Sequence, residues 1–330
     1  MTHLDRVYLD ALPVYAFLLF LLGASAVFTL RSPVVVVTDD VFSAVYGPRR
    51  EHHKRIEMSV RLFRRIKLVR ISESAEIDAV VFAADDAARM PLAAVFPYRY
   101  YDAALRYAAL NPKTVPVVLA GLNTISFDLK PEQKGNPVLF IKQDENTDFY
   151  RAGLCAAFLS GREARPFLFP KKNDGGKTVL VIKNEKSSGQ ADSFFEQGMR
   201  KGESGASSVF KGINDNYPLS ELSCFVLCGP SNGFLYSSTE NEIPNIVFSW
   251  IDPDFSSPTT KIIIDDSPLQ LLPVIVKSLR RGEVKKRLRA GENTEAFVPS
   301  TFKIMCLRTG SLPLILSLGI AANLPTPNEL

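Results

Sequence analysis

Acidic, amide and aromatic side chains recur where apolar runs of the chain end, which is where an α/β sheet places its ligand groups. Carboxylates and amides can exchange hydrogen bonds with a bound molecule, and aromatic rings can pack against its flat faces. The candidate ligand-binding residues in this pattern are Asp39, Asp40, Phe42, Asn123, Asn232, Trp250, Asp252 and Asp266. These residue types favour binding of a small polar ligand.

Each of these residues also has a purely structural interpretation. Trp250 can be a core or interface aromatic, and Asp252, which precedes Pro253, can form a turn. Asp266 and the pair Asp39–Asp40 can cap the helices that follow them. The ligand hypothesis therefore depends on these side chains meeting at one edge of the fold.

Motifs for catalysis are scarce in the sequence. The histidines are His3, His52 and His53, so a Ser–His–Asp site would have to use the adjacent pair. The sequence has no Gly-x-Ser-x-Gly motif, no P-loop and no GxGxxG turn after its first apolar run. Its His and Cys residues also lack the spacing of a zinc site. We therefore expect no enzyme activity, no cofactor and no metal.

The cysteines are Cys155, Cys224, Cys228 and Cys306, and their spacing is not that of a disulfide framework. On a strand, Cys224 and Cys228 would lie roughly 13 Å apart, which is too far for a disulfide. We expect buried thiols.

The charge balance does not favour nucleic acid as a partner. The formal net charge is +4, from 39 basic and 35 acidic residues. Nucleic-acid-binding proteins normally gather basic residues on one face. The local basic clusters around Arg61–Arg65 and Arg280–Arg289 are typical of solvated helix faces.

The segment Leu12–Leu30, LPVYAFLLFLLGASAVFTL, carries no charge and is just long enough to cross a bilayer as a helix. Its ASA sequence at Ala24–Ala26 is suited to cleavage by signal peptidase, but Asp5 and Asp10 oppose the charge of Arg6 before it. We favour an uncleaved anchor in the inner membrane with the rest of the chain in the periplasm. The alternative is a periplasmic or secreted protein cleaved near Ala26.

Beyond residue 31, apolar runs alternate with amphipathic ones. The strands expected in the first half are Val34–Val37, Lys67–Ile71, Ala79–Ala83, Val115–Ala120 and Val138–Ile141. Those expected in the second half are Thr178–Ile182, Ser208–Gly212, Cys224–Cys228, Ile246–Trp250 and Lys261–Ile264. The helices expected between them are Arg50–Phe63, Tyr100–Leu110, Phe149–Ser160, Gln190–Arg200 and Leu269–Leu279. Two consecutive α/β halves that join near residue 147 account for this pattern.

Three finer expectations concern the ends of these elements. Asn146, Thr147 or Asp148 can cap the helix that begins the second half. The stretch Phe297–Met305 is expected to return as a strand to the first half, and Leu312–Ala322 to dock as a core element. Within each half the carboxyl ends of parallel strands meet at one edge, and two facing edges would enclose one ligand cleft.

Four stretches in this order resemble the type 1 periplasmic-binding-protein superfamily, which includes sugar- and nucleoside-binding proteins and LacI-type effector domains. They are EIDAVVFAA (Glu76–Ala84), TVPVVLAGL (Thr114–Leu122), QDENTDFYRAGLCAAFL (Gln143–Leu159) and the closing run Asn245–Gly282. The resemblance implies two doubly wound, Rossmann-like α/β lobes with a hinge, preceded by one hydrophobic helix. It gives residues 1–31 as the anchor or signal peptide, 33–147 as lobe 1, 148–266 as lobe 2 and 267–330 as a return to lobe 1 with a tail.

The resemblance also implies a function. The exported, membrane-tethered protein would capture a small polar ligand, such as a sugar or nucleoside, between its lobes for an ABC permease. The alternative is a ligand-free or sensory ectodomain that contacts another envelope protein. It is favoured by Gly121–Leu122, where sugar binders carry Asp-Arg, and by an anchor that has no cysteine nearby for lipid attachment. Gly229 or Pro230, where an asparagine is usual, is a further departure from sugar binders. An enzyme on this fold ranks last because histidines are so few.

Overall fold

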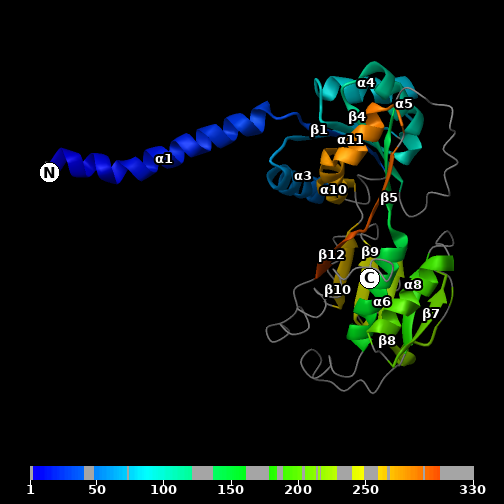
Figure 1. Cartoon of the computed structure of the whole chain (residues 1–330). Helices are drawn as coiled ribbons and strands as arrows, with labels where there is room; N and C mark the ends of the chain where they lie inside the picture. The colour runs from blue at the N-terminus through cyan, green and yellow to red at the C-terminus, as the bar shows by residue number, and fades with distance from the viewer. Residues whose placement is uncertain are drawn as a thin grey trace.

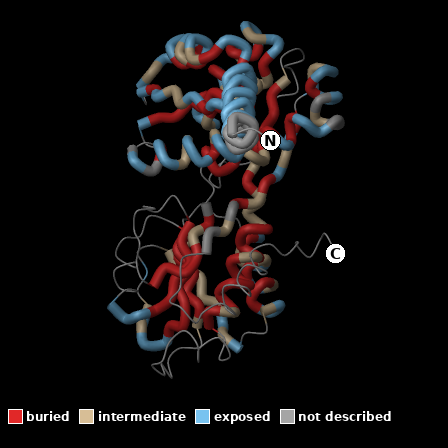
Figure 2. Tube along the Cα trace, turned by 90° about the vertical axis from the view of Figure 1, so that its left-hand side faces the viewer, coloured by how far each residue is buried: buried red, intermediate tan, exposed pale blue. Residues whose placement is uncertain are grey.

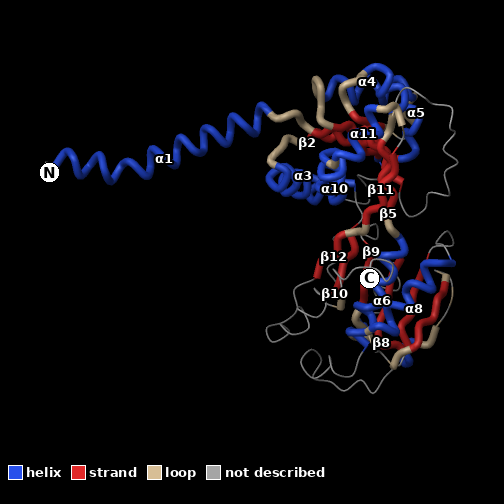
Figure 3. The backbone as a smooth tube through the Cα atoms, in the orientation of Figure 1, coloured by secondary structure: helices blue, strands red, loops and turns tan. Residues whose placement is uncertain are grey.

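The computed structural model describes residues 3–40, 48–72, 74–120, 137–160, 178–183, 189–202, 205–212, 215, 217–228, 240–248, 259–265, 268–292 and 294–304. These residues form two α/β lobes and a long N-terminal helix that extends from the upper lobe in Figure 1. Helices flank the strands of both lobes, as Figure 3 shows. Two doubly wound lobes preceded by one apolar helix were predicted, and this architecture is confirmed.

Lobe 1, the upper lobe, is built on a six-stranded sheet with the order β11-β5-β4-β3-β1-β2. All neighbouring strands in this sheet are parallel. The strands are β1 (Val34–Asp39), β2 (Ile66–Ile71), β3 (Ala93–Pro97), β4 (Val115–Ala120), β5 (Leu139–Gln143) and β11 (Thr294–Val298). A parallel sheet needs crossover helices, and these bury both of its faces.

The sequence of β1 shows how the two faces of this sheet are buried. Val34 and Val36 pack with α3 (Pro48–Leu62), α10 (Pro268–Arg280) and α11 (Gly282–Arg289). Val35 and Val37 pack on the opposite face with α4 (Ile77–Ala87) and α5 (Tyr101–Leu110). Side chains alternate along a strand, so a strand covered on both sides needs apolar residues at every position. The run of four valines meets this need, and burial of each one contributes roughly 1.5 kcal/mol or more.

Lobe 2 has a second six-stranded sheet with the order β12-β10-β9-β8-β6-β7. Its strands are parallel except for β12, which pairs antiparallel with β10. They are β6 (Thr178–Lys183), β7 (Ser207–Lys211), β8 (Leu222–Cys228), β9 (Asn245–Phe248), β10 (Thr260–Asp265) and β12 (Thr301–Ile304). On one face lie α6 (Glu145–Ser160) and α8 (Gly189–Lys201), which share the core of this lobe. Figure 2 shows the buried residues of both lobes along their strands.

The N-terminal helix α1 (His3–Leu30) stands apart from both sheets, and the burial colours of Figure 2 mark most of its coloured residues as exposed. Its segment Pro13–Leu30 is long and apolar enough to cross a membrane, and none of it is buried in the protein. Signal sequences and membrane anchors both have this character. An exposed apolar helix of this length is unfavourable in water. We therefore expect it either to lie in a membrane or to be removed by cleavage.

The predicted strand Ala79–Ala83 is wrong, because these residues lie within α4. Burial of Val80, Val81 and Ala84 in one turn matches the helical period, and Ala88 continues the same face. The strand that was missed is β3, whose burial at Ala93–Phe96 continues along the chain without alternation. A short apolar run in the sequence does not separate a buried strand from a buried helix.

Two finer expectations about element ends also differ from the structure. The stretch Phe297–Met305 contains two strands rather than one, because Pro299 cannot donate a ladder hydrogen bond. β11 ends before it in lobe 1, and β12 begins after it in lobe 2. The cap of α6 is Asp144, whose carboxylate accepts a hydrogen bond from the Thr147 N–H at 3.0 Å. Residues 312–322 lie outside the described part of the chain.

Candidate ligand site at the junction of the lobes

The chain crosses between the lobes after β5 and again after β11, and hydrogen bonds join these two connections. Gln143, at the end of β5, is in register with Val298, at the end of β11. The fully buried Asp148 carboxylate accepts hydrogen bonds from the Ser300 N–H at 2.8 Å and from the Ser300 hydroxyl at 2.6 Å. Gln143 Nε2 donates to the same carboxylate at 2.8 Å. A buried carboxylate is tolerated only when its oxygens are bonded in this way, so Asp148 ties the two connections to each other.

The carboxyl ends of the strands in both sheets lie at this junction. In lobe 1, β5 and β11 end there directly. In lobe 2, α6 begins there, and its Phe149 ring lies 5.6 Å from the ring of Phe248, the last residue of β9. Parallel neighbours end at the same edge of each sheet. The junction therefore brings the two edges that carry ligand groups in α/β proteins close to each other.

An ion pair lies at the carboxyl edge of lobe 1. Asp39 is the last residue of β1, and Arg99 follows the neighbouring strand β3. Arg99 Nη1 lies 3.1 Å from Asp39 Oδ2, and the Arg99 guanidinium carbon lies 5.0 Å from the centre of the Tyr100 ring. The Asp39 side chain is only 9% exposed, whereas that of Arg99 is 34% exposed. Arg99 can therefore donate further hydrogen bonds toward solvent or a ligand.

A second ion pair lies at the carboxyl edge of lobe 2. Lys183 ends β6, and its Nζ lies 2.5 Å from Asp192 Oδ2 in the first turn of α8. The same Nζ lies 5.2 Å from the centre of the Phe210 ring on β7. Asp192 Oδ1 is buried and has no hydrogen-bond partner among the described residues. A buried acceptor without a partner costs free energy, so this atom can gain from a ligand donor.

The thiol of Cys228 closes the same edge at the end of β8. Burial raises the pKa of Cys228 well above its usual value. The nearby carboxylates of Glu145 and Asp192 raise the pKa further, and Lys183 lowers it. The thiol therefore stays protonated at neutral pH and acts as an apolar wall, because nucleophilic attack and metal binding both require the thiolate. The described residues contain no group of three or more His, Cys, Asp or Glu side chains that could hold a metal.

Comparison with solved structures decides the fold. An ABC transporter solute-binding protein from Conexibacter woesei matches 90% of this chain and 99% of its own, with a TM-score of 0.55 and 14% identity. A transcriptional activator of the comK gene from Bacillus halodurans matches 90% of this chain and 100% of its own, with a TM-score of 0.52 and 9% identity. The chain has the type 1 periplasmic-binding-protein fold. No family model matches the sequence, and no curated protein sequence matches it either.

Within this type 1 fold, the described residues include two of the predicted ligand residues. Asp39 lies at the carboxyl edge of lobe 1 in its ion pair, and Asp40 is exposed directly after it. The other predicted ligand residues lie outside the described part of the chain, and they are Phe42, Asn123, Asn232, Trp250, Asp252 and Asp266.

The structure adds residues to this edge that sequence reasoning missed. Arg99 was missed because the strand before it, β3, was not predicted. Lys183 and Asp192 were missed although the strand and the helix that carry them were expected. A test for charged residues at the end of each predicted strand would have found Lys183. Asp192 can be recognised as a residue of this edge only from the structure, in which α8 places it beside Lys183.

Proposed function

We propose that this protein is a membrane-anchored solute-binding protein that captures a small polar ligand, sugar- or nucleoside-like, between its lobes for an ABC-type transporter. The observation that carries the proposal is the placement of two ion pairs at the facing carboxyl edges. Asp39 and Arg99 stand on lobe 1, and Lys183 and Asp192 stand on lobe 2. The fold, shared with a protein described as an ABC transporter solute-binding protein, supports the same role.

Each ion pair holds donors and acceptors in place before the ligand arrives. The Arg99 guanidinium is fixed by Asp39 and by the Tyr100 ring, so little side-chain entropy is lost when it binds a ligand oxygen. On lobe 2, the free oxygen of Asp192 can accept a hydroxyl or amine donor. The ligand-contacting residues that we propose beside these are Asp39, Asp40, Phe42, Asn123, Asn232, Trp250, Asp252 and Asp266.

Closure of the lobes follows from ligand contacts on both edges. A ligand that binds only one lobe leaves the polar groups of the other lobe in water. A ligand that bridges both lobes favours the closed state by its differential affinity. The junction can bend without losing either sheet, because each sheet is complete within its own lobe.

An anchor formed by α1 would keep this function at the membrane. We propose that α1 stays in the inner membrane as a single span, with both lobes in the periplasm. This would keep the lobes next to a permease in the same membrane. Cleavage near Ala26 would instead release a periplasmic binding protein with the same site.

Native mass spectrometry of the full chain, purified from its own cells, tests the ligand proposal. We expect a small polar molecule to co-purify and to be absent from an Asp39→Ala variant that still folds. Purification with a protein partner and no small molecule would contradict the proposal and favour a ligand-free ectodomain.

A further inference from the structure

The base of lobe 1, defined as the amino-terminal edge of its sheet, is held firmly against the end of α1. The Leu92 N–H donates to Pro33 O at 2.8 Å, and Arg64 Nη1 donates to Ser32 O at 2.8 Å. The ring of Phe28, in the last turn of α1, packs edge-on against Phe63 at 5.6 Å. The connection from α1 to β1 is therefore short and bonded on both sides. If α1 crosses a membrane, the base of lobe 1 lies at its surface.

Basic residues dominate the described part of this base. They precede the strands or end the helices at that edge, and they are Arg31, Arg64, Arg65, Arg89, Lys113, Arg280, Arg281, Lys286, Arg287 and Arg289. The acidic residues at the same edge are Asp85, Asp86 and Glu292. The pKa of Arg64 lies below its usual value, first because of burial and then because of Arg280 and Arg31. Like charges are thus gathered where α1 ends, a cost that nearby anions would offset.

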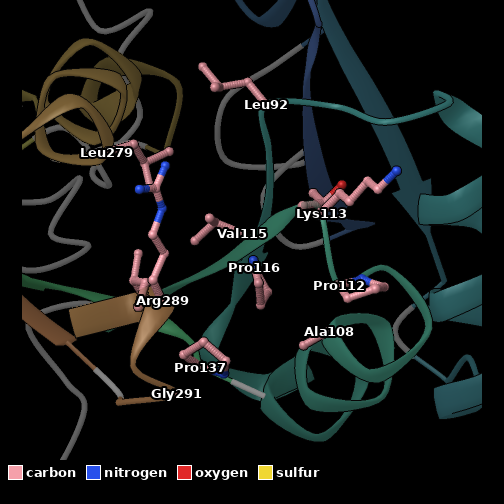
Figure 4. A pocket seen from close by; sticks show the side chains of 12 residues that line it. Leu92, Ala108, Pro112, Lys113, Val115, Pro116, Pro137, Leu279, Arg289 and Gly291 are labelled. Carbon is pink, nitrogen blue, oxygen red and sulfur yellow. The ribbon is translucent and has the colours of Figure 1, made fainter. Parts of the chain in front are cut away.

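A cavity of about 580 Å³ opens at this base. Its lining includes residues that stand before or at the start of four strands: Leu92, Val115, Pro137 and Gly291. The walls are largely apolar, and the charged residues that line it are Lys113 and Arg289. Figure 4 shows the Arg289 guanidinium beside Leu279, across the cavity from Val115, with Lys113 on the other side and its amine directed outward.

The charges of this cavity are unbalanced. None of the residues that line it is acidic. Within the described part of the chain, neither Lys113 nor Arg289 forms an ion pair. A cavity with apolar walls and unpaired cations fits an anion that also carries an apolar part. The candidate ligand site lies at the opposite edge of the sheet, so this cavity is separate from it.

We propose that the cavity at the base of lobe 1 binds the anionic headgroup of a phospholipid in the membrane that α1 crosses. The proposal rests on α1 acting as an anchor. Arg289 would contact the phosphate, Lys113 would bind at the rim, and the apolar wall would receive the glycerol region. The negative potential of an anionic bilayer surface attracts nearby basic residues. Anions dissolved in water do not reach the same local concentration around these residues. Lobe 1 would then be fixed on the bilayer, and lobe 2 would move.

Hydrogen exchange of the full chain in lipid nanodiscs tests this site. The discs contain phosphatidylcholine alone or phosphatidylcholine mixed with phosphatidylglycerol. We expect the backbone of α11 and of residues 112–116 to exchange more slowly only in the mixed discs. A Lys113→Gln, Arg289→Gln variant neutralises both cations. Its affinity for phosphatidylglycerol, read from this protection, should be about 25-fold weaker, at about fivefold per charge.

Matched controls separate a lipid site from general charge effects. An Arg200→Gln, Lys201→Gln variant changes two exposed basic residues of α8 in lobe 2 and should leave the protection intact. Arg289→Lys, which keeps the charge, should retain most of it, and melting curves verify that every variant folds. Equal protection in both kinds of disc, or protection by free glycerol phosphate in discs of phosphatidylcholine alone, would overturn the proposal.

Alkaline carbonate extraction of membranes distinguishes failure of the lipid site from failure of the anchor. Release of the protein would refute the anchor and the lipid site together. Retention without lipid-dependent protection would refute the lipid site alone.

Discussion

Asp148 and Ser300 are separated by 152 residues in the chain, yet two hydrogen bonds of 2.8 and 2.6 Å join them at the junction of the lobes. Asp148 begins the passage into lobe 2, and Ser300 lies on the passage from β11 to β12. One buried carboxylate therefore ties two crossings of the chain together. Ser300 also holds the Gln143 amide at 2.6 Å, so the three side chains form one network.

Substitution of this carboxylate should loosen the junction. In Asp148→Asn the amide nitrogen can no longer accept from the Ser300 hydroxyl or from Gln143. We expect a loss of about 3 kcal/mol in the free energy of unfolding, measured by urea titration, because bonds to a buried charged group are lost. The control Asp78→Asn changes a carboxylate that is 80% exposed, and it should cost about 0.5 kcal/mol or less. Equal stability of the two variants would contradict this account of the junction.

The ion pair at the edge of lobe 1 should matter for ligand binding. Asp39→Asn removes the charge that orients Arg99, so we expect the affinity for the co-purifying ligand to fall about tenfold or more by calorimetry. Glu295→Gln is the matched control, because it breaks an ion pair in the same lobe, with Lys142 at 2.9 Å. It should bind as the wild type does. If both variants bind equally well, Asp39 lies outside the ligand site.

The contact of α6 with α8 depends on glycine at the crossing. A Cβ atom at Gly198 would clash with the carbonyl oxygen of Tyr150 and lie 2.9 Å from the Leu154 nitrogen. Because backbone atoms cannot move aside locally, Gly198→Ala should destabilise the protein by about 3 kcal/mol in urea unfolding. Gly205→Ala has open space for its methyl group and should change stability little. A stable Gly198→Ala variant would show that the helices do not pack this closely.

Stability should fall in alkaline solution partly through one tyrosine. Burial raises the pKa of Tyr107 to about 12, from 10.0 in the unfolded chain. The raised pKa of Tyr107 adds to the free energy of unfolding. This contribution is complete below pH 10 and is lost as the pH rises toward 12, because the unfolded state releases the tyrosine proton first. Over this range the unfolding free energy of Tyr107→Phe should fall less steeply than that of the wild type, by about 1.4 kcal/mol per pH unit. Parallel curves would mean that Tyr107 ionises equally in both states.

Much of the fold could be predicted because its signals are local. The valines of β1 are apolar at every position, and the matching helix–strand alternation in both halves indicates two doubly wound lobes. The same reasoning failed at Ala79–Ala83, where an apolar run belongs to a helix. The run Ala79–Ala83 by itself does not show whether its apolar residues follow the period of a strand or that of a helix.

The site was less predictable because its pairs join distant parts of the chain. Asp39 could be singled out from its place at the end of the first apolar run, but its partner Arg99 lies 60 residues away and follows a strand that was missed. The bond from Asp148 to Ser300 depends on the register of β5 with β11, which no local pattern specifies. Such pairs follow from the tertiary fold rather than from neighbouring residues.

The distance between the lobes is the most direct test of the central claim, that a ligand binds between them and closes them. Spin labels at Arg106→Cys on α5 and Arg200→Cys on α8 report this distance by double electron–electron resonance. The native Cys155, Cys224 and Cys228 are buried, and Cys306→Ser removes the remaining thiol. With the co-purifying ligand we expect a shorter mean distance and a narrower distance distribution. At the same ligand concentration, the Asp39→Asn variant should not show this change. An unchanged distance while the ligand is bound would contradict closure of two lobes around it.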